Sequence, residues 1–271
     1  MPTDDVRLLA AWGAAMLLAG PAPAAQRVLS FDQCADQYVL ALAPRASIVG
    51  LSRRALNADS YLRDKAAGLP RLRATAESAL GATPTMVVRY WGGEPRLVEA
   101  LERRGVEVVT LDDATDFPGV RVNIRRVAAA FGRAAAGEAL IARMDRELAA
   151  AAGAGGGRGV LYVTSGGDTM GRGTLVDAML RAAGFANLAA RAGFGVISLE
   201  RLALAPPALL VLGFFDQNMA AYERWSIGRQ PVLRSLIARR AAVSLPAAIL
   251  GCPAWFAADG SRDLAAWGRR H

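Results

Sequence analysis

The sequence predicts an α/β protein of two similarly built lobes with parallel sheets, and three observations point to this class. Short apolar runs bounded by proline or glycine recur along the chain, as strands buried on both faces of a parallel sheet do. A unit that opens with Glu77 and has Pro84 seven residues later returns with the same spacing as Glu200 and Pro207. Residues 120–152, between the two units, show helical patterning instead of strands. A repeated helix-to-strand unit on either side of a helical stretch indicates two lobes and a helical connector.

The first lobe is expected over residues 26–118. A strand is expected at residues 27–31, and Asp32 follows it where a carboxylate can cap the next helix. Residues 52–73 are polar and rich in arginine, which favours a loop. The other elements expected here are strands at 48–51, 86–91 and 106–111, the short helix that Glu77 opens, and a helix at 95–104.

The connector is expected over residues 119–157, with helices at 123–131 and 135–152. At 1.5 Å per residue the second helix would be about 27 Å long, which is enough to bridge two lobes. A run of glycines after it marks the end of the helix.

The second lobe is expected over residues 158–271. A strand at 160–164 precedes a glycine-rich loop at 165–173. Thr174 then suits a helix start of the capping-box kind, and Gly184 suits the end of that helix. The remaining elements expected are strands at 209–214 and 242–245 and helices at 231–239 and 262–270.

Residues 1–25 are predicted to be a secretory signal peptide. Their apolar run at residues 8–19 is too short to span a bilayer, and Ala22 and Ala24 give a small-x-small cleavage pattern. The alternative is an N-terminal anchor or a buried helix, because the start of the chain carries more acidic than basic residues. A cleaved signal predicts a periplasmic protein, and no later stretch of the sequence reaches transmembrane length.

The net charge of +8 and the isoelectric point near 10.4 raise the question of nucleic-acid binding. The arginines are scattered among acidic residues, and the sequence has no zinc-knuckle or RNP motif. We therefore expect no nucleic-acid partner, and a basic surface that favours small anions or an anionic membrane face.

Two stretches are more specific than the overall pattern. Residues 88–93 read Val-Arg-Tyr-Trp-Gly-Gly, and residues 169–174 read Thr-Met-Gly-Arg-Gly-Thr. With the two repeated units and the order lobe, helix, lobe, the chain resembles the periplasmic solute-binding proteins of ABC importers for metal chelates, the helical-backbone class (class III). Its cobalamin-binding members are the nearest model, as distant relatives. The resemblance covers the chain after the predicted signal, and it implies two Rossmann-like lobes joined by one long backbone helix. It also implies a monomer that binds a chelate and has no catalytic residues and no cofactor of its own.

In that family one surface glutamate per lobe docks into arginine pockets on the two permease subunits in the inner membrane. Glu77 and Glu200 fall on those positions. Carboxylates at helix starts are held in a defined orientation and can pair with arginine in a bidentate manner. The alternative role for each glutamate is to stabilise its own helix N-terminus, and the matched spacing of the pair favours docking.

The resemblance also places the ligand between the lobes, at the carboxyl ends of the parallel strands. Tyr90 and Phe194 fall on aromatic positions of the cobalamin-binding members, and Trp255 matches a third position more loosely. Any single aromatic residue is equally accounted for as part of the core. Further candidates, chosen because they neighbour strand ends, are Arg53, Trp91, Phe214 and Phe215.

Two departures from the cobalamin-binding pattern affect the expected ligand. Arg71 stands where an aromatic residue is expected six positions before Glu77, and Ala257 and Ala258 replace an acid and a base. Because arginine side chains suit anionic ferric chelates, Arg71 is a further ligand candidate. We expect a ferric siderophore, with cobalamin as the close alternative.

Cys34 and Cys252 are the only cysteines, and an even count in an exported protein favours a disulfide over two free thiols. Their predicted places, one in each lobe, would put such a bond across or beside the cleft. The only histidine is the last residue, His271. Histidine-based zinc sites, Ser-His-Asp catalysis and histidine-ligated haem are therefore not expected, while haem ligation by tyrosine or methionine stays open.

The alternative class is a two-lobed α/β enzyme of the glycosyltransferase kind. Gly171 and Gly173 near a helix start suit a phosphate, but the full dinucleotide fingerprint and the lysine of a P-loop are missing. The Ser165-Gly-Gly stretch also lacks nucleophile-elbow spacing. Export further disfavours this alternative, because nucleotide-sugar donors are scarce outside the cytoplasm.

Overall fold

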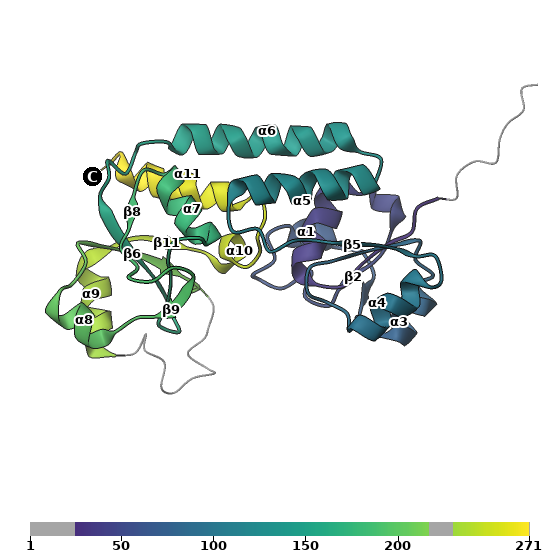
Figure 1. Cartoon of the computed structure of the whole chain (residues 1–271), viewed down its shortest axis with the longest axis horizontal. Coiled ribbons are helices and arrows are strands. Elements are labelled where there is room, and N and C mark those ends of the chain that lie inside the picture. Colours follow the sequence, from purple (N-terminus) through teal and green to yellow (C-terminus); the bar gives the residue numbers. More distant parts are fainter. Residues whose placement is uncertain (1–24, 217–229, 271) are drawn as a thin grey trace, which may run out of the picture.

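The structure is a computed structural model, which describes residues 25–216 and 230–270. The predicted signal peptide lies almost entirely outside the described residues. Two α/β lobes lie side by side beneath one long helix (Figure 1). The two-lobed α/β class predicted from the sequence is confirmed.

The first lobe contains a five-stranded parallel sheet. Its strands are β1 (Val28–Ser30), β2 (Ile48–Ser52), β3 (Arg71–Leu72), β4 (Met86–Arg89) and β5 (Glu107–Thr110), and their spatial order is β3-β2-β1-β4-β5. The strands consist largely of buried apolar residues, as a sheet covered on both faces requires. The helices of this lobe are α1 (Gln33–Leu42), α2 (Arg63–Ala66), α3 (Ala76–Gly81) and α4 (Pro95–Glu102), with a short 3-10 turn at Arg45–Ser47.

The second lobe contains a four-stranded parallel sheet and a separate hairpin. The sheet has the order β11-β10-β6-β8, from β6 (Gly159–Thr164), β8 (Ala186–Asn187), β10 (Leu209–Gly213) and β11 (Ala241–Leu245). The hairpin pairs β7 (Asp168–Met170) with β9 (Phe194–Val196) in antiparallel fashion. The helices are α7 (Leu175–Ala182), α8 (Leu199–Leu204), α9 (Pro231–Arg240), α10 (Ala247–Leu250) and α11 (Ala257–Gly268).

Two helices connect the lobes, α5 (Phe117–Ala130) and α6 (Ala134–Ala151). Helix α6 lies along the top of the molecule in Figure 1 and packs on both α5 and α11. The approach of α5 and α6 is close, because a Cβ on Gly137 would lie 2.6 Å from the Cβ of Ala128. Helix α6 corresponds to the long bridging helix predicted at residues 135–152, which is confirmed.

Helix α5 begins six residues before the predicted start at residue 123. Asp116 accepts a hydrogen bond from the Gly119 backbone N–H at 2.8 Å, and Pro118 occupies the first turn, where a proline is tolerated. Three other expectations also need correction: residues 52–73 contain α2 and β3, the loop expected at 165–173 contains β7, and the last helix begins at Ala257 instead of 262.

One continuous core joins the lobes on the α6 side. It includes Val120 and Ile124 of α5, Met144 of α6, Met179 of α7 and Leu264 of α11. Two smaller cores lie on the opposite faces of the sheets, under α3 and α4 in the first lobe and under α8 and α9 in the second. The shared core and the bridging helix favour a structure whose lobes move little relative to one another.

Residues 251–259, which we call the crossing segment, return from the second lobe to the first. The Tyr38 hydroxyl of α1 donates a hydrogen bond to the Pro253 carbonyl at 2.7 Å, and its ring meets Trp255 edge-on with centroids 5.4 Å apart. Tyr61 stacks on Phe256 at 4.3 Å. The crossing segment therefore completes the packing of the first lobe.

Candidate functional site

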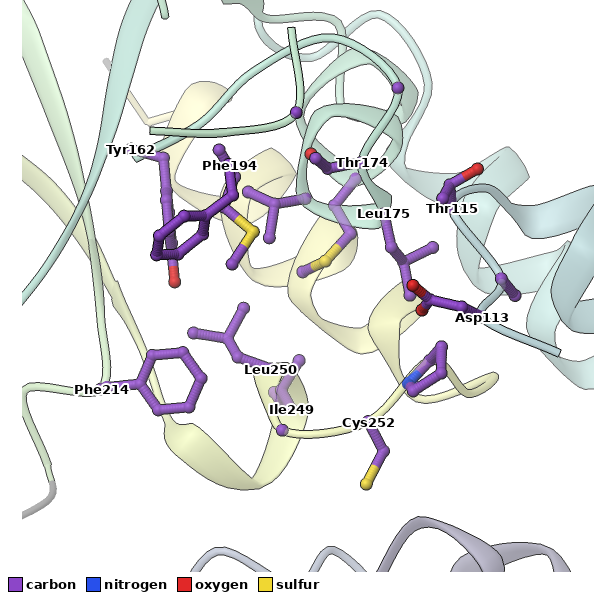
Figure 2. Close-up of a pocket in the computed structure, with 18 of the residues that line it drawn as sticks. Asp113, Thr115, Tyr162, Thr174, Leu175, Phe194, Phe214, Ile249, Leu250 and Cys252 are labelled. Atoms are coloured by element: carbon purple, nitrogen blue, oxygen red, sulfur yellow. The ribbon is translucent and has the colours of Figure 1, made fainter. Parts of the chain in front are cut away.

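A cavity of about 460 Å³ lies between the lobes, at the carboxyl ends of their strands (Figure 2). Tyr90 follows β4, Asp113 lies just beyond β5, and Phe214 follows β10. In open α/β sheets this end of the strands is the usual place for a ligand. We call this cavity, which residues of both lobes line, the interlobe cleft.

The wall of the interlobe cleft is mainly apolar. Among the described residues that line it, Asp113 is the only charged side chain, and the side-chain hydroxyls come from Tyr90, Thr115, Tyr162 and Thr174. Such a surface suits a ligand that is largely apolar with a few polar atoms. Its apolar side chains are Met170, Leu175, Val176, Met179, Phe194, Phe214, Ile249 and Leu250.

Asp32 fixes the loop that carries Tyr90. One carboxylate oxygen accepts hydrogen bonds from the backbone N–H groups of Cys34 and Ala35, which caps α1 as predicted. The other oxygen accepts from the backbone N–H of Tyr90 at 2.7 Å and of Gly92 at 3.0 Å. One buried carboxylate therefore holds both the start of α1 and the wall of the cleft.

The Tyr90 hydroxyl donates a hydrogen bond to Asp113 Oδ1 at 2.5 Å. Burial, together with the negative charge of Asp113, raises the pKa of Tyr90 well above its usual value. The phenol is therefore neutral at physiological pH and serves as a donor, and its ring forms part of the wall.

Tyr162 of β6 has a buried hydroxyl, with no hydrogen-bond partner in the part of the chain that the structure describes. Its ring lies over Gly213 of the neighbouring strand, where any side chain would overlap with the hydroxyl. Burial raises the pKa of Tyr162, so this phenol is also neutral.

A second cavity, of about 700 Å³, is larger but lies within the second lobe. Strand β9 and helix α8 line it, together with Arg191 and Arg201. Phe194 borders both cavities. We assign the ligand site to the interlobe cleft because residues of both lobes line it, whereas the larger cavity has residues of one lobe only.

The structure brings three of the predicted ligand residues into the interlobe cleft: Tyr90, Phe194 and Phe214. Trp255 was predicted to contact the ligand but does not line the cleft. The residue is only 3% exposed, and its ring packs on Tyr38 and Phe256 in the core. The other predicted residues do not line the cleft: Phe215 packs on the core beneath α8, while Arg53, Arg71 and Trp91 are exposed at the surface.

Glu77 and Glu200 occupy equivalent positions. Each is exposed and is the second residue of a six-residue helix, α3 or α8. Thr75 caps α3 by accepting from Ser78 N–H, and Ser198 caps α8 by accepting from Arg201 N–H. Both helices lie on the side of the molecule away from α6, one in each lobe (Figure 1). The two helices that carry these glutamates therefore lie on the same side of the molecule.

The disulfide predicted between Cys34 and Cys252 is present in the structure. It joins the start of α1 to the crossing segment, and Cys252 also lines the interlobe cleft.

Within residues 25–216 and 230–270, no group of three or more histidine, cysteine or acidic side chains is placed to hold a metal ion. In the same ranges, no helix combines the length and the hydropathy that crossing a bilayer requires.

Asp113 and Tyr162 are two of the lining residues that the sequence did not predict. Asp113 lies shortly after a predicted strand, so its position at a strand end was the available signal. Tyr162 lies inside an apolar run, where nothing distinguishes a tyrosine that faces a cavity from one in the core.

Comparison with known proteins agrees with this geometry. The arrangement of two α/β lobes, a bridging helix and an interlobe cleft defines a two-lobed ligand-binding protein of the helical-backbone class. The family model described as "Periplasmic binding protein" matches residues 28–249, and the chain belongs to this family. The family consists of binding proteins, so the enzyme alternative is excluded.

Similar solved structures include the periplasmic haem-binding protein BhuT, determined with two haems. It is 27% identical, with 90% of this chain and 98% of that chain covered and a TM-score of 0.69. A periplasmic haem-binding protein from Pseudomonas aeruginosa is 25% identical, with 89% and 91% covered and a TM-score of 0.65. The periplasmic vitamin B12-binding protein BtuF of Vibrio cholerae is 15% identical, with 90% and 97% covered and a TM-score of 0.65, and shows the fold alone. No curated protein sequence matches the chain significantly.

Proposed function

We propose that this protein is the substrate-binding component of an ABC importer, working as a monomer that carries a preformed metal chelate. The observation that supports this most directly is the interlobe cleft, an apolar cavity of about 460 Å³ with one carboxylate in its wall. A cavity of this size and lining is typical of small-molecule sites. Family membership supports a periplasmic location, and the signal peptide over residues 1–25 remains a prediction.

The lining favours a neutral or positively charged chelate. Burying an anion is costly unless cationic groups pair with it, and Asp113 is the only charged side chain that the described residues contribute to the wall. A ferric siderophore of neutral or cationic hydroxamate type, or a corrinoid, fits these requirements better than a polyanionic catecholate. Arg71, which suggested an anionic complex, does not line the cleft, and neither does Arg53.

The chelate would supply the metal with its coordination shell already complete. Tyr90 keeps its proton because burial and the hydrogen bond to Asp113 both raise its pKa, and a neutral phenol is a poor ligand for iron(III). Burial raises the pKa of Tyr162 as well, so this phenol is also neutral. Met170 and Met179 also contribute thioether sulfur atoms to the wall.

Haem is the second candidate ligand. Two haem-binding proteins with 27% and 25% identity over about nine-tenths of this chain support it. The apolar wall suits the porphyrin faces, whereas the two propionates would have to lie away from Asp113, in solvent or against a hydrogen-bond donor of the wall.

The permease dimer in the inner membrane is the proposed partner. Glu77 and Glu200 are exposed residues of α3 and α8, which lie on one side of the molecule, and each would pair with arginine on one permease subunit. Their identical positions in two capped helices support a shared role better than two independent helix-stabilising roles.

A thermal-unfolding screen of the purified protein tests the ligand class. The probes are cyanocobalamin, ferrioxamine B as a cationic hydroxamate complex, haemin, and ferric enterobactin as a polyanionic catecholate. A true ligand at 100 times its Kd should stabilise the protein by about 2.7 kcal/mol. Stabilisation by ferric enterobactin alone would contradict the proposed charge preference, and stabilisation by none of the four would contradict the proposed function.

A further inference from the structure

The unpartnered hydroxyl of Tyr162 is the feature of the interlobe cleft that the fold itself does not explain. Tyr162 is 0% exposed, and its hydroxyl has no partner among the described residues. A buried hydroxyl that makes no hydrogen bond destabilises a protein, and native structures contain few of them. Such a group therefore indicates a partner that is absent from the free protein.

The strand arrangement directs this hydroxyl toward the cleft. Tyr162 pairs with Val211 in the parallel sheet, and its ring extends along β10 to Gly213. Because Gly213 has no side chain, the hydroxyl fits above the end of β10. It points toward the part of the cavity where Phe214 and Leu250 lie (Figure 2).

We infer that Tyr162 is a specificity-determining residue whose hydroxyl donates a hydrogen bond to an acceptor oxygen of the bound chelate. The inference rests on the proposed function and specifies one point of ligand recognition. Amide carbonyls of a corrinoid, hydroxamate oxygens and haem propionates all provide such an acceptor. Because the hydroxyl is shielded from water in the free protein, the ligand reaches it when flexible lining side chains such as Met170 shift.

Tyr162 and Asp113 together make the cleft chemically asymmetric. The second lobe offers a donor at Tyr162, and the first lobe offers the Asp113 carboxylate, which already accepts from Tyr90. A chelate with an acceptor at one end and a donor or positive charge at the other satisfies both groups. The same chelate turned end for end leaves the Tyr162 hydroxyl without a partner and gives Asp113 no partner beyond Tyr90, so the two groups would also fix the orientation of the ligand.

The test is the Tyr162→Phe variant, which removes only the oxygen atom. Its first readout, unfolding of the ligand-free protein in urea, needs no ligand. Since the lost hydroxyl has no partner, Tyr162→Phe should be at least as stable as the wild type. Tyr38→Phe is the matched control: Tyr38 is also 0% exposed, but its hydroxyl donates to the Pro253 carbonyl, so this variant should be less stable.

The second readout is affinity by calorimetry, with cyanocobalamin, ferrioxamine B or haemin as the probe, whichever stabilises the wild type. Tyr162→Phe should bind that probe roughly tenfold more weakly, because an acceptor on the ligand is left unpaired in an apolar wall. Affinity within twofold of the wild type would overturn the inference while leaving the proposed function intact. A loss of stability in the free variant would also overturn it, since the hydroxyl would then have a partner such as a buried water. If no probe stabilises the wild type, the proposed function fails, and the urea readout still decides whether the hydroxyl is unpaired.

Discussion

Cys34 and Cys252 form a disulfide that joins the two lobes across 218 positions of sequence. Cys34 lies in the first turn of α1, and Cys252 lies in the crossing segment, which also contacts Tyr38 and Tyr61 of the first lobe. The bond therefore reinforces a contact between lobes that aromatic packing already makes.

Removing the disulfide should lower the free energy of unfolding by about 2–4 kcal/mol, because a cross-link that closes a long loop restricts the unfolded chain. The measurement is urea unfolding of the wild type with and without dithiothreitol, beside the double variant Cys34→Ala with Cys252→Ala. The reduced wild type and the double variant should unfold at the same urea concentration. Identical midpoints for the oxidised and reduced wild type would show that the bond adds no stability.

Reversing both surface glutamates, by Glu77→Arg with Glu200→Arg, should abolish transport and leave chelate affinity unchanged. Both residues are exposed and lie outside the interlobe cleft, so only an interaction with another protein is lost. Uptake by cells and calorimetry with the purified variant give the two readouts. Glu138→Arg on α6 is the matched control, since its exposed pair with Arg125 contributes little stability and should not affect uptake. Full uptake by the double variant would exclude the docking role.

Tyr90 contributes its ring to the cleft and keeps its phenolic proton, and two substitutions separate these properties. Tyr90→Ala should weaken chelate binding by about 1–2 kcal/mol, because an aromatic wall is lost. Tyr90→Phe keeps the ring, and with haemin as the probe the absorption spectrum of the complex should not change. Loss of a phenolate-to-iron absorption band in Tyr90→Phe would contradict the neutral role and identify Tyr90 as an iron ligand.

Asp36 should make the protein less stable as the pH rises from 4 to 7. Burial between α1 and β2 raises its pKa from 3.8 to about 6, against the opposing effect of hydrogen bonds from Ser52. A raised folded-state pKa means that the folded protein binds the proton more tightly. The contribution to stability is therefore present below pH 4 and is lost as the pH passes through 6, by roughly 2–3 kcal/mol.

Urea unfolding at pH 4.5 and pH 7.5 measures this dependence. Asp36→Asn should reduce the difference between the two pH values, and Asp64→Asn, at an almost fully exposed site, should leave it as in the wild type. An equal pH difference in the wild type and in Asp36→Asn would show that another group is responsible.

Local patterns predicted the fold well where a residue's structure depends on its neighbours in sequence. The units at Glu77 and Glu200 are short capped helices followed by buried strands, as their prolines and apolar runs indicated. Helix α6 was predicted within one residue, because an amphipathic stripe and a glycine stop lie in the same stretch. Hairpin β7–β9 was missed, since its strands are three residues long and far apart in sequence.

The site was predicted less completely, because side chains from distant segments form it. Trp255 looked like a cleft residue, but its partner Tyr38 lies more than 200 positions earlier and places it in the core. Arg53 follows a strand end in sequence and Arg71 stands where an aromatic residue was expected, yet both residues are exposed. The position of the Tyr162 hydroxyl depends on Gly213 of the adjacent strand, which leaves room for it, and the sequence alone does not show that these two residues are neighbours.

The crossing segment has a consequence for how the chain matures. Trp255 and Phe256 complete the packing around Tyr38 and Tyr61, so the first lobe lacks part of its interior until residues 251–259 have been synthesised. If synthesis and translocation proceed from the amino terminus, the first lobe stays incompletely packed until these residues are available. This order would disfavour folding of the first lobe before the crossing segment has been translocated.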